Sequence, residues 1–191
     1  EKDLHNVWDT CNFRSKWNDF RKGISQNTLD LCEGKEFEEI RDKLEQYPKK
    51  THASLLIPAI AESFNNSWNR INDEFFNRLK KLMKKPICCK EITGYLTTVR
   101  RCPYDYNKDN PLFFVNLFGG IPNALRTAGH EIMHIQFHNT YWEGVEKRIG
   151  KEKTGDLKEA LTVLLNLEFK DLWIVQDEGY PSHKELRTFI E

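Results

Sequence analysis

No stretch of this sequence is apolar for long enough to cross a membrane. The longest candidate, residues 55–61, is short and is interrupted by Pro58, whereas a membrane-spanning helix requires about 20 apolar residues. An excess of charge of one sign is also missing, because 29 acidic residues balance 29 basic ones. This balance argues against a nucleic-acid binder that relies on bulk positive charge. We therefore expect neither a membrane nor a nucleic acid among the partners.

A cysteine pattern typical of a metal site or a disulfide scaffold is absent. The cysteines are an odd number without C-x-x-C spacing, namely Cys11, Cys32, Cys88, Cys89 and Cys102. Reduced thiols are therefore the favoured interpretation. A second metal site built from the adjacent pair 88–89 with Cys102 is the less favoured alternative. There is no signal-peptide pattern either, and the expected location is cytoplasmic.

The first half of the chain has the periodicity of helices. Apolar residues recur at intervals of three and four in residues 15–24, 34–47 and 53–84, the last being one helix or two with a bend near Pro58. The basic end at 78–85 is favoured as an ordinary solvated helix terminus rather than a patch for a partner. We expect residues 1–85 to be a helical region packed on a second region, 86–191, within one compact domain.

After Pro86 the pattern changes to that of strands and then returns to helices. Residues 91–101 and 111–120 are rich in β-branched and aromatic side chains, and the polar stretch 104–111 between them predicts a hairpin loop. Pro122 can begin the next helix, and a further helix is expected over 156–169. The predicted fold class is α+β, with a small mixed or antiparallel sheet preceded by a mainly helical N-terminal half.

The helix that follows the second strand carries the motif HEIMH at residues 130–134. Side chains four residues apart lie one above the other on a helix, so His130 and His134 can hold one metal ion. Glu131 would lie beside the pair, where a general base for a metal-bound water is needed. A catalytic zinc normally takes three protein ligands, so a third ligand must come from another element.

Glu159 is the favoured third ligand. It stands in a helix that is apolar almost all round, where a carboxylate is costly to bury unless it is paired or binds a metal. The alternative is that Glu159 occupies an N-terminal turn, which the helix dipole would favour. His138 is unsuitable as a ligand, because three residues stacked along one helix would span about 12 Å. It is expected at the helix end or beside the ligands.

With His130, Glu131, His134 and the downstream Glu159, residues 91–185 resemble the gluzincin branch of the zincin metallopeptidases, the group that includes thermolysin. The resemblance implies a zincin-like catalytic part and one Zn²⁺ held by His130, His134 and Glu159. It also implies Glu131 as general base and a peptide or protein substrate.

One position departs from the thermolysin pattern. In thermolysin-like relatives an Asp one turn after the ligand Glu braces a histidine, and that position is Val163 here. The chain is therefore not a close thermolysin relative, and the brace is expected from Thr162, Asn166 or a backbone carbonyl.

The resemblance further implies a hydrogen-bond donor for the oxyanion in the segment after the glutamate helix. Residues 177–187 contain Tyr180, His183 and Arg187, and no spacing rule separates Tyr180 from His183. His183 can equally be a surface residue where a C-terminal helix begins. The strand at 111–120 would, by the same resemblance, be a sheet edge that binds extended substrate.

The leading functional hypothesis is a zinc-dependent peptidase. One alternative is a zincin-like binding or interaction module without general turnover. Another is a helical interaction protein in which the HExxH pattern is accidental. The sequence does not indicate the substrate or the oligomeric state.

Overall fold

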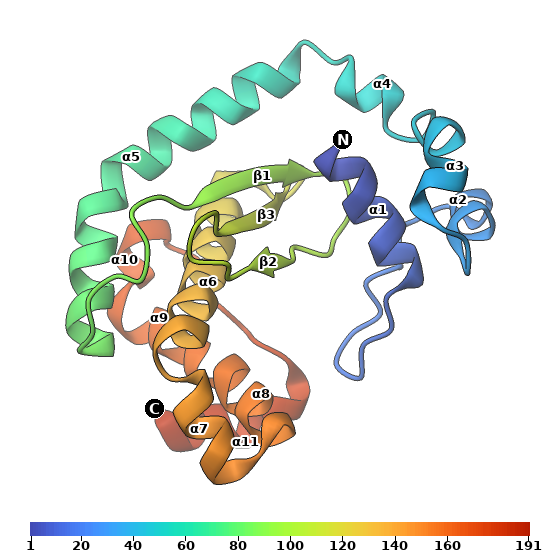
Figure 1. The fold of residues 1–191 in the computed structure, drawn as a ribbon. Coiled ribbons are helices and arrows are strands. Elements are labelled where there is room, and N and C mark those ends of the chain that lie inside the picture. The colour runs from blue at the N-terminus through green and yellow to red at the C-terminus, as the bar shows by residue number, and fades with distance from the viewer.

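The computed structural model describes residues 1–191 and combines many helices with one small sheet (Figure 1). The helices are α1 (Lys2–Asn12), α2 (Gln26–Cys32), α3 (Phe37–Leu44), α4 (Lys49–His52), α5 (Leu56–Met83), α6 (Gly120–Thr140), α7 (Trp142–Ile149), α8 (Lys151–Ala160), α9 (Leu164–Glu168), α10 (Lys170–Trp173) and α11 (Lys184–Ile190). The strands are β1 (Thr93–Thr97), β2 (Tyr104–Asp105) and β3 (Leu112–Asn116), and the 3₁₀ turns are η1 (Leu161–Val163) and η2 (Pro181–His183). The predicted α+β class is confirmed.

The sheet is mixed, with the strand order β1-β3-β2. β1 runs parallel to β3, and the short β2 pairs antiparallel with the opposite side of β3. The predicted hairpin between 91–101 and 111–120 is therefore wrong. After β1 the chain continues to the opposite edge of the sheet, where it forms β2, and then returns to form β3 between the two. β3 is the central strand, so its predicted role as a sheet edge is also wrong.

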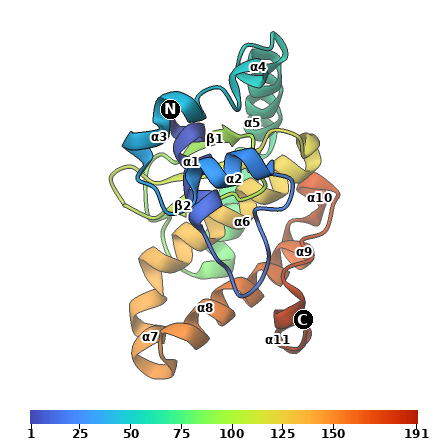
Figure 2. The same cartoon turned by 90° about the vertical axis from the view of Figure 1, so that its right-hand side faces the viewer.

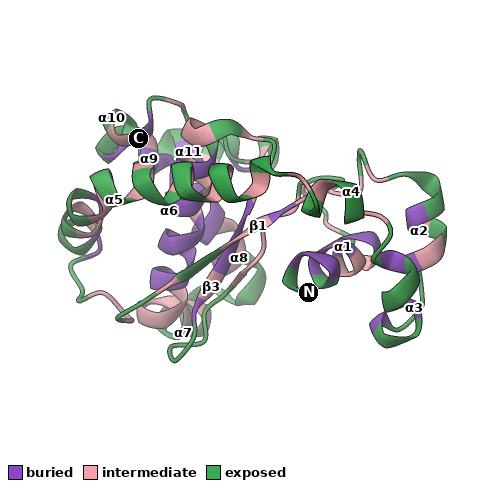
Figure 3. Cartoon of the chain, turned by 90° about the horizontal axis from the view of Figure 1, so that it is seen from above, coloured by how far each residue is buried: buried purple, intermediate pink, exposed green.

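The main hydrophobic core lies between the sheet and the helices α5, α6, α9 and α10. α6 is buried along much of its length, whereas α5 turns an exposed face outward (Figure 3). Phe75 from α5 and Trp173 from α10 are among the largest fully buried side chains, and each such burial contributes about 1.5–3 kcal/mol. A Cβ on Gly129 would lie 2.7 Å from the Trp173 ring. Glycine at this position thus permits α6 to pack closely just before its first histidine.

A smaller second core joins α1, α2 and α3. It contains Leu4 and Val7 of α1, Cys32 of α2, Ile40 and Leu44 of α3 and their neighbours. Figure 3 shows this group at one end of the molecule. α5 instead belongs to the main core. The domain boundary near residue 85 stays a prediction.

Two of the helices expected in the first half are present. Residues 34–47 contain the shorter α3, and residues 53–84 form one continuous helix, α5. Pro58 does not bend α5 because it lies in the first turn, where no intrahelical partner for its missing N–H is needed. None of the helices combines the length and the apolar character that a bilayer crossing demands.

The helix expected at 15–24 is absent, and these residues form a loop with turns. The Ser15 hydroxyl accepts a hydrogen bond from the Trp17 N–H at 3.1 Å, and the Asp19 carboxylate accepts one from the Arg21 N–H at 3.1 Å. Such local bonds from side chain to backbone compete with helix formation. Trp17, one of the aromatic residues whose spacing suggested a helix, packs instead on a distant segment. Its ring stacks on that of Tyr180 with a centroid distance of 5.5 Å.

The helix expected at 156–169 is broken into three pieces, α8, η1 and α9. α8 starts earlier than expected, at Lys151, and ends just after Glu159. The Thr162 hydroxyl donates to the Glu159 carbonyl at 2.7 Å, which accompanies the change from α-helix to 3₁₀ turn. Glu159 consequently lies at the end of a helix.

Candidate metal centre

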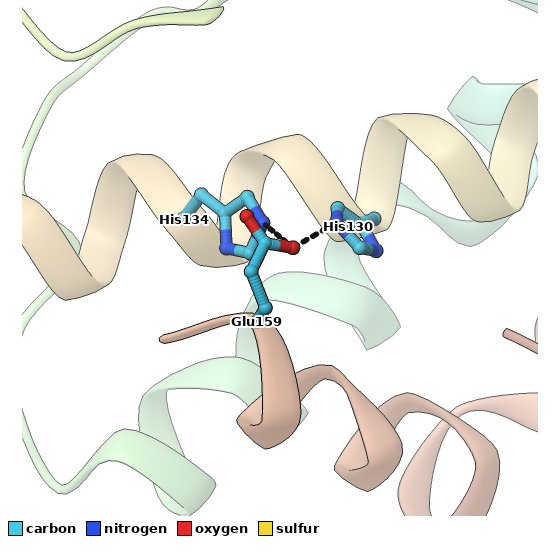
Figure 4. Close-up of side chains that lie close together, drawn as sticks. All are labelled: His130, His134 and Glu159. Atoms are coloured by element: carbon cyan, nitrogen blue, oxygen red, sulfur yellow. Dashed lines mark ion pairs between the residues drawn. The ribbon is translucent and has the colours of Figure 1, made fainter. Parts of the chain in front are cut away.

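The candidate metal ligands come together between two helices. His130 and His134 project from α6, and Glu159 projects from the end of α8 toward both imidazoles (Figure 4). The Glu159 Oε2 atom lies 3.6 Å from His130 Nε2 and 3.3 Å from His134 Nε2. The potential ligand atoms of the three residues all lie within 4.8 Å of one another. The structure therefore brings together the three ligands that the sequence suggested, in a group that could hold one metal ion.

The position of Glu159 is informative in itself. It lies in the last turn of α8 and is only 6% exposed, so the alternative of an N-terminal-turn Glu is wrong. A helix C-terminus disfavours a carboxylate. Burial alone would raise the pKa of Glu159, but the imidazoles and the Lys158 ammonium lower it overall. The Lys158 Nζ donates to Glu159 Oε1 at 2.6 Å, so Oε2 faces the histidines.

The brace that orients His130 is Asp177, which sequence reasoning missed. The His130 Nδ1 lies 2.8 Å from Asp177 Oδ2, and an ionised carboxylate can only accept, so Nδ1 carries the proton. The Nε2 of His130 is thereby left to face Glu159. A carboxylate behind a ligating histidine is the usual support of a protein metal site.

Asp177 is itself held by groups from several elements. Arg126 of α6 donates to its Oδ2 at 2.9 Å, and Arg187 of α11 donates to Oδ1 at 3.3 Å and to its backbone carbonyl. Thr162 and Asn166, which the sequence suggested as braces, bond to Asp177 instead of to a histidine. The only available sequence signal was that Asp177 begins the segment 177–187.

The charges of the two histidines differ because their surroundings differ. Burial by itself lowers the pKa of both imidazoles. For His130 the carboxylates of Asp177, Glu159 and Glu131 together outweigh burial and raise the pKa. For His134 burial dominates and the pKa is lowered, so this imidazole is neutral at physiological pH. His134 is thus in the protonation state that a metal ligand requires.

Glu131 lies beside the ligands and is mostly buried. Burial raises the pKa of Glu131 to about 7. A carboxylate with such a pKa can both take up and release a proton near neutral pH, which is what a general base followed by a general acid must do.

A cleft of about 460 Å³ opens onto the candidate centre. Residues from the loop 13–20, in which a helix was expected, form one wall of the cleft. This loop extends from α1 toward α8 (Figure 2), and Lys16 bonds to Glu152 of α8 at 2.7 Å. Besides the candidate ligands and Glu131, the cleft is lined by several aromatic and basic side chains, among them Trp17, Arg100, Tyr104, Arg126, Lys158 and Tyr180.

The two candidate oxyanion donors differ in their position relative to the cleft. Tyr180 lines the cleft, and burial raises the pKa of its phenol, which therefore keeps its proton. His183 is buried outside the cleft, where it contacts Asp156 at 3.2 Å and the edge of Trp17. Gly179 has φ +63°, and a Cβ there would lie 2.6 Å from Arg187. A glycine at this position permits the turn that carries Tyr180 past Arg187.

Neither the cysteines nor His138 belongs to the group of side chains that could hold a metal ion. The Cys88 and Cys89 sulfurs lie 3.4 Å apart, but His130, His134 and Glu159 form the only group of three metal-ligating residues that converges. His138 is stacked between Tyr106 and Trp142, each with a centroid distance of 4.2 Å.

The environment of His138 predicts a pH-dependent stability. Burial lowers the pKa of His138 to about 4 from an ordinary 6.5. Between these values the unfolded chain binds a proton that the folded chain excludes, so the free energy of unfolding falls as the pH drops through this window. We expect His138→Phe, which keeps the stacking, to reduce the loss of stability between pH 7 and pH 5 by about 1 kcal/mol. Urea unfolding at both pH values measures this, and an equal loss in parent and variant would contradict it.

Comparison with known proteins adds no relative, since no family model, curated protein or solved structure matches this chain.

Proposed function

We propose that the protein is a zinc-dependent peptidase of the zincin type. The observation that carries the proposal is the convergence of the ligand atoms of His130, His134 and Glu159 within 4.8 Å, in a cleft that Glu131 also lines. The sequence motif alone can occur by chance. The convergence of Glu159 from a different helix, together with a carboxylate behind His130, supports a metal site much more strongly.

The residues present fit zinc. Two imidazole nitrogens and one carboxylate oxygen are a common ligand set of catalytic zinc sites, which leave one position open. Softer metals would favour thiolate ligands, and calcium or magnesium would favour an all-oxygen set. The opening of the cleft beside the three side chains provides room for a water molecule and a substrate carbonyl.

The chain's own residues then have distinct roles. Zinc, when bound, supplies a Lewis acid that lowers the pKa of water and polarises a carbonyl group. Glu131 would accept the proton of the attacking water and transfer it to the leaving amine. Tyr180 would donate a hydrogen bond to the oxygen of the scissile carbonyl as it gains negative charge. Asp177 would keep the His130 ring in the tautomer that leaves Nε2 free.

The size of the cleft supports a peptide segment as substrate. A volume of about 460 Å³ lies in the range of ligand pockets, which suits a few residues of an extended chain. The nearest sheet edge is β2, since Pro103 and Tyr104 line the cleft. An edge strand offers free backbone groups to which an extended peptide can bond.

Metal analysis tests the proposal first. Protein purified without added zinc should contain about one zinc per chain by mass spectrometry, and His134→Ala should lose most of it because only two ligands remain. His52→Ala is the matched control, since His52 pairs with Asp3 far from the centre. A peptide library then identifies the cleaved bonds. Absence of metal, together with no uptake on titration at neutral pH, would contradict the proposed function.

A further inference from the structure

Tyr104 contributes a second phenol to the cleft, from an element that sequence analysis treated as a loop. It is the first residue of β2, which lies beside α6 (Figure 1). Its ring centroid is 5.3 Å from that of His134. Tyr104 is thus next to a candidate ligand, on the sheet side of the cleft, whereas Tyr180 comes from the C-terminal segment.

The hydroxyl of Tyr104 is oriented by a buried ammonium group. Lys158 is only 8% exposed, and its Nζ donates to Tyr104 Oη at 3.1 Å and to Glu159 Oε1 at 2.6 Å. One lysine therefore joins the phenol to the ligand carboxylate. An ammonium group has only donors, so the phenol oxygen must be the acceptor in this bond.

The consequence concerns the phenolic proton. A tyrosine hydroxyl has one proton to donate, and no group of the chain accepts it, since the bond from Lys158 is the only hydrogen bond of this hydroxyl. The proton is consequently available to a group bound in the cleft. A donor that is fixed in place before substrate arrives is the arrangement that stabilises a developing oxyanion most effectively.

We propose that Tyr104 is a catalytic residue of this site, donating its phenolic proton in a hydrogen bond to the oxyanion, and that Lys158 is the positioning residue that orients the phenol. This inference rests on the proposed function. The same ammonium group bonds to Glu159 Oε1, so that Oε2 remains free to bind the metal beside His134. Lys158 thereby links the phenol and the ligand carboxylate through two hydrogen bonds.

The test uses a small probe so that it does not depend on knowing the peptide. The full-length protein is loaded with cobalt, whose visible spectrum reports the ligand set, and is titrated with acetohydroxamate, which chelates the metal through anionic oxygen. We expect Tyr104→Phe to leave the spectrum before titration unchanged and to weaken acetohydroxamate binding about tenfold, because a hydrogen bond to a charged acceptor is lost. Tyr106→Phe is the matched control, since Tyr106 is half-exposed and stacks on His138 outside the cleft.

A second variant tests the orienting role. Lys158→Met should weaken acetohydroxamate binding more in the parent protein than in the Tyr104→Phe background, because the part of its effect that acts through the Tyr104 hydroxyl is already lost there, whereas its bond to Glu159 is lost in both. Equal effects in both backgrounds would show that Lys158 acts by charge and would overturn its positioning role. For the identified peptide substrate, Tyr104→Phe should lower kcat about 10²–10³-fold with little change in KM.

The outcomes distinguish this inference from the proposed function. Protein that takes up no cobalt would contradict both. A normal cobalt spectrum with unchanged acetohydroxamate affinity in Tyr104→Phe would contradict only the role of Tyr104 and would leave the metal centre in place.

Discussion

Replacing Glu131 with Gln is expected to lower kcat for peptide hydrolysis about 10²–10⁴-fold while zinc stays at one per chain. Gln has nearly the same shape but cannot accept the proton of the attacking water. Glu131 is not among the three converging ligands, so the metal should be retained. Steady-state kinetics on the identified peptide, with metal analysis of the same samples, measure both quantities.

Glu143→Gln provides the control for this substitution. Glu143 lies on α7, where it pairs with Lys147 on the surface, and its replacement should leave kcat unchanged. If Glu131→Gln hydrolyses the peptide as fast as the parent, Glu131 is not the general base. If the variant loses its zinc, the lost activity reports on metal binding instead.

Replacing Asp177 with Ala is expected to lower the free energy of unfolding of the metal-free protein by about 3–5 kcal/mol. Asp177 is 1% exposed and pairs with His130, Arg126 and Arg187. Alanine would leave the buried Arg187 and the partly buried Arg126 and His130 without their carboxylate. Urea unfolding with EDTA present measures the change.

Asp171→Ala is the matched control, because Asp171 pairs with Arg78 while 63% exposed; its loss should cost less than about 1 kcal/mol. Equal shifts in the two variants would contradict the central role of Asp177.

The pH dependence of the free energy of unfolding provides a second measurement of the role of Asp177. Burial alone would raise the pKa of Asp177, but the charges of His130 and Arg126 lower it overall. Its contribution is therefore present above the unfolded-state pKa of 3.8 and is lost as the pH falls below that value.

The candidate ligands could be selected from the sequence because their signals are local. The spacing of His130 and His134 fixes their common face once a helix forms, and the apolar surroundings of Glu159 mark it as a carboxylate that needs a partner. The long helix α5 was predictable for the same reason, since its apolar stripe is continuous.

Asp177 and Tyr104 were not predictable in this way. Asp177 lies in an irregular segment after α10, and Tyr104 begins a strand of two residues. Neither has a periodic pattern that indicates which way its side chain points. Their roles depend on tertiary contacts, namely the bond of Asp177 to His130 and that of Tyr104 to Lys158. The parallel pairing of β1 and β3 was missed because strand propensity carries no information about direction.

The wall of the cleft formed by residues 13–20 has a consequence for the order of folding. Lys16 and Glu152, which join this loop to α8, are 136 positions apart in the sequence, whereas the candidate metal ligands and Asp177 all lie within the second half. Closing a longer stretch of chain loses more entropy, and such contacts are typically made late. The folding chain is therefore expected to gather its candidate metal ligands before this wall is in place, so that the last contacts to form are also those that give the cleft its shape.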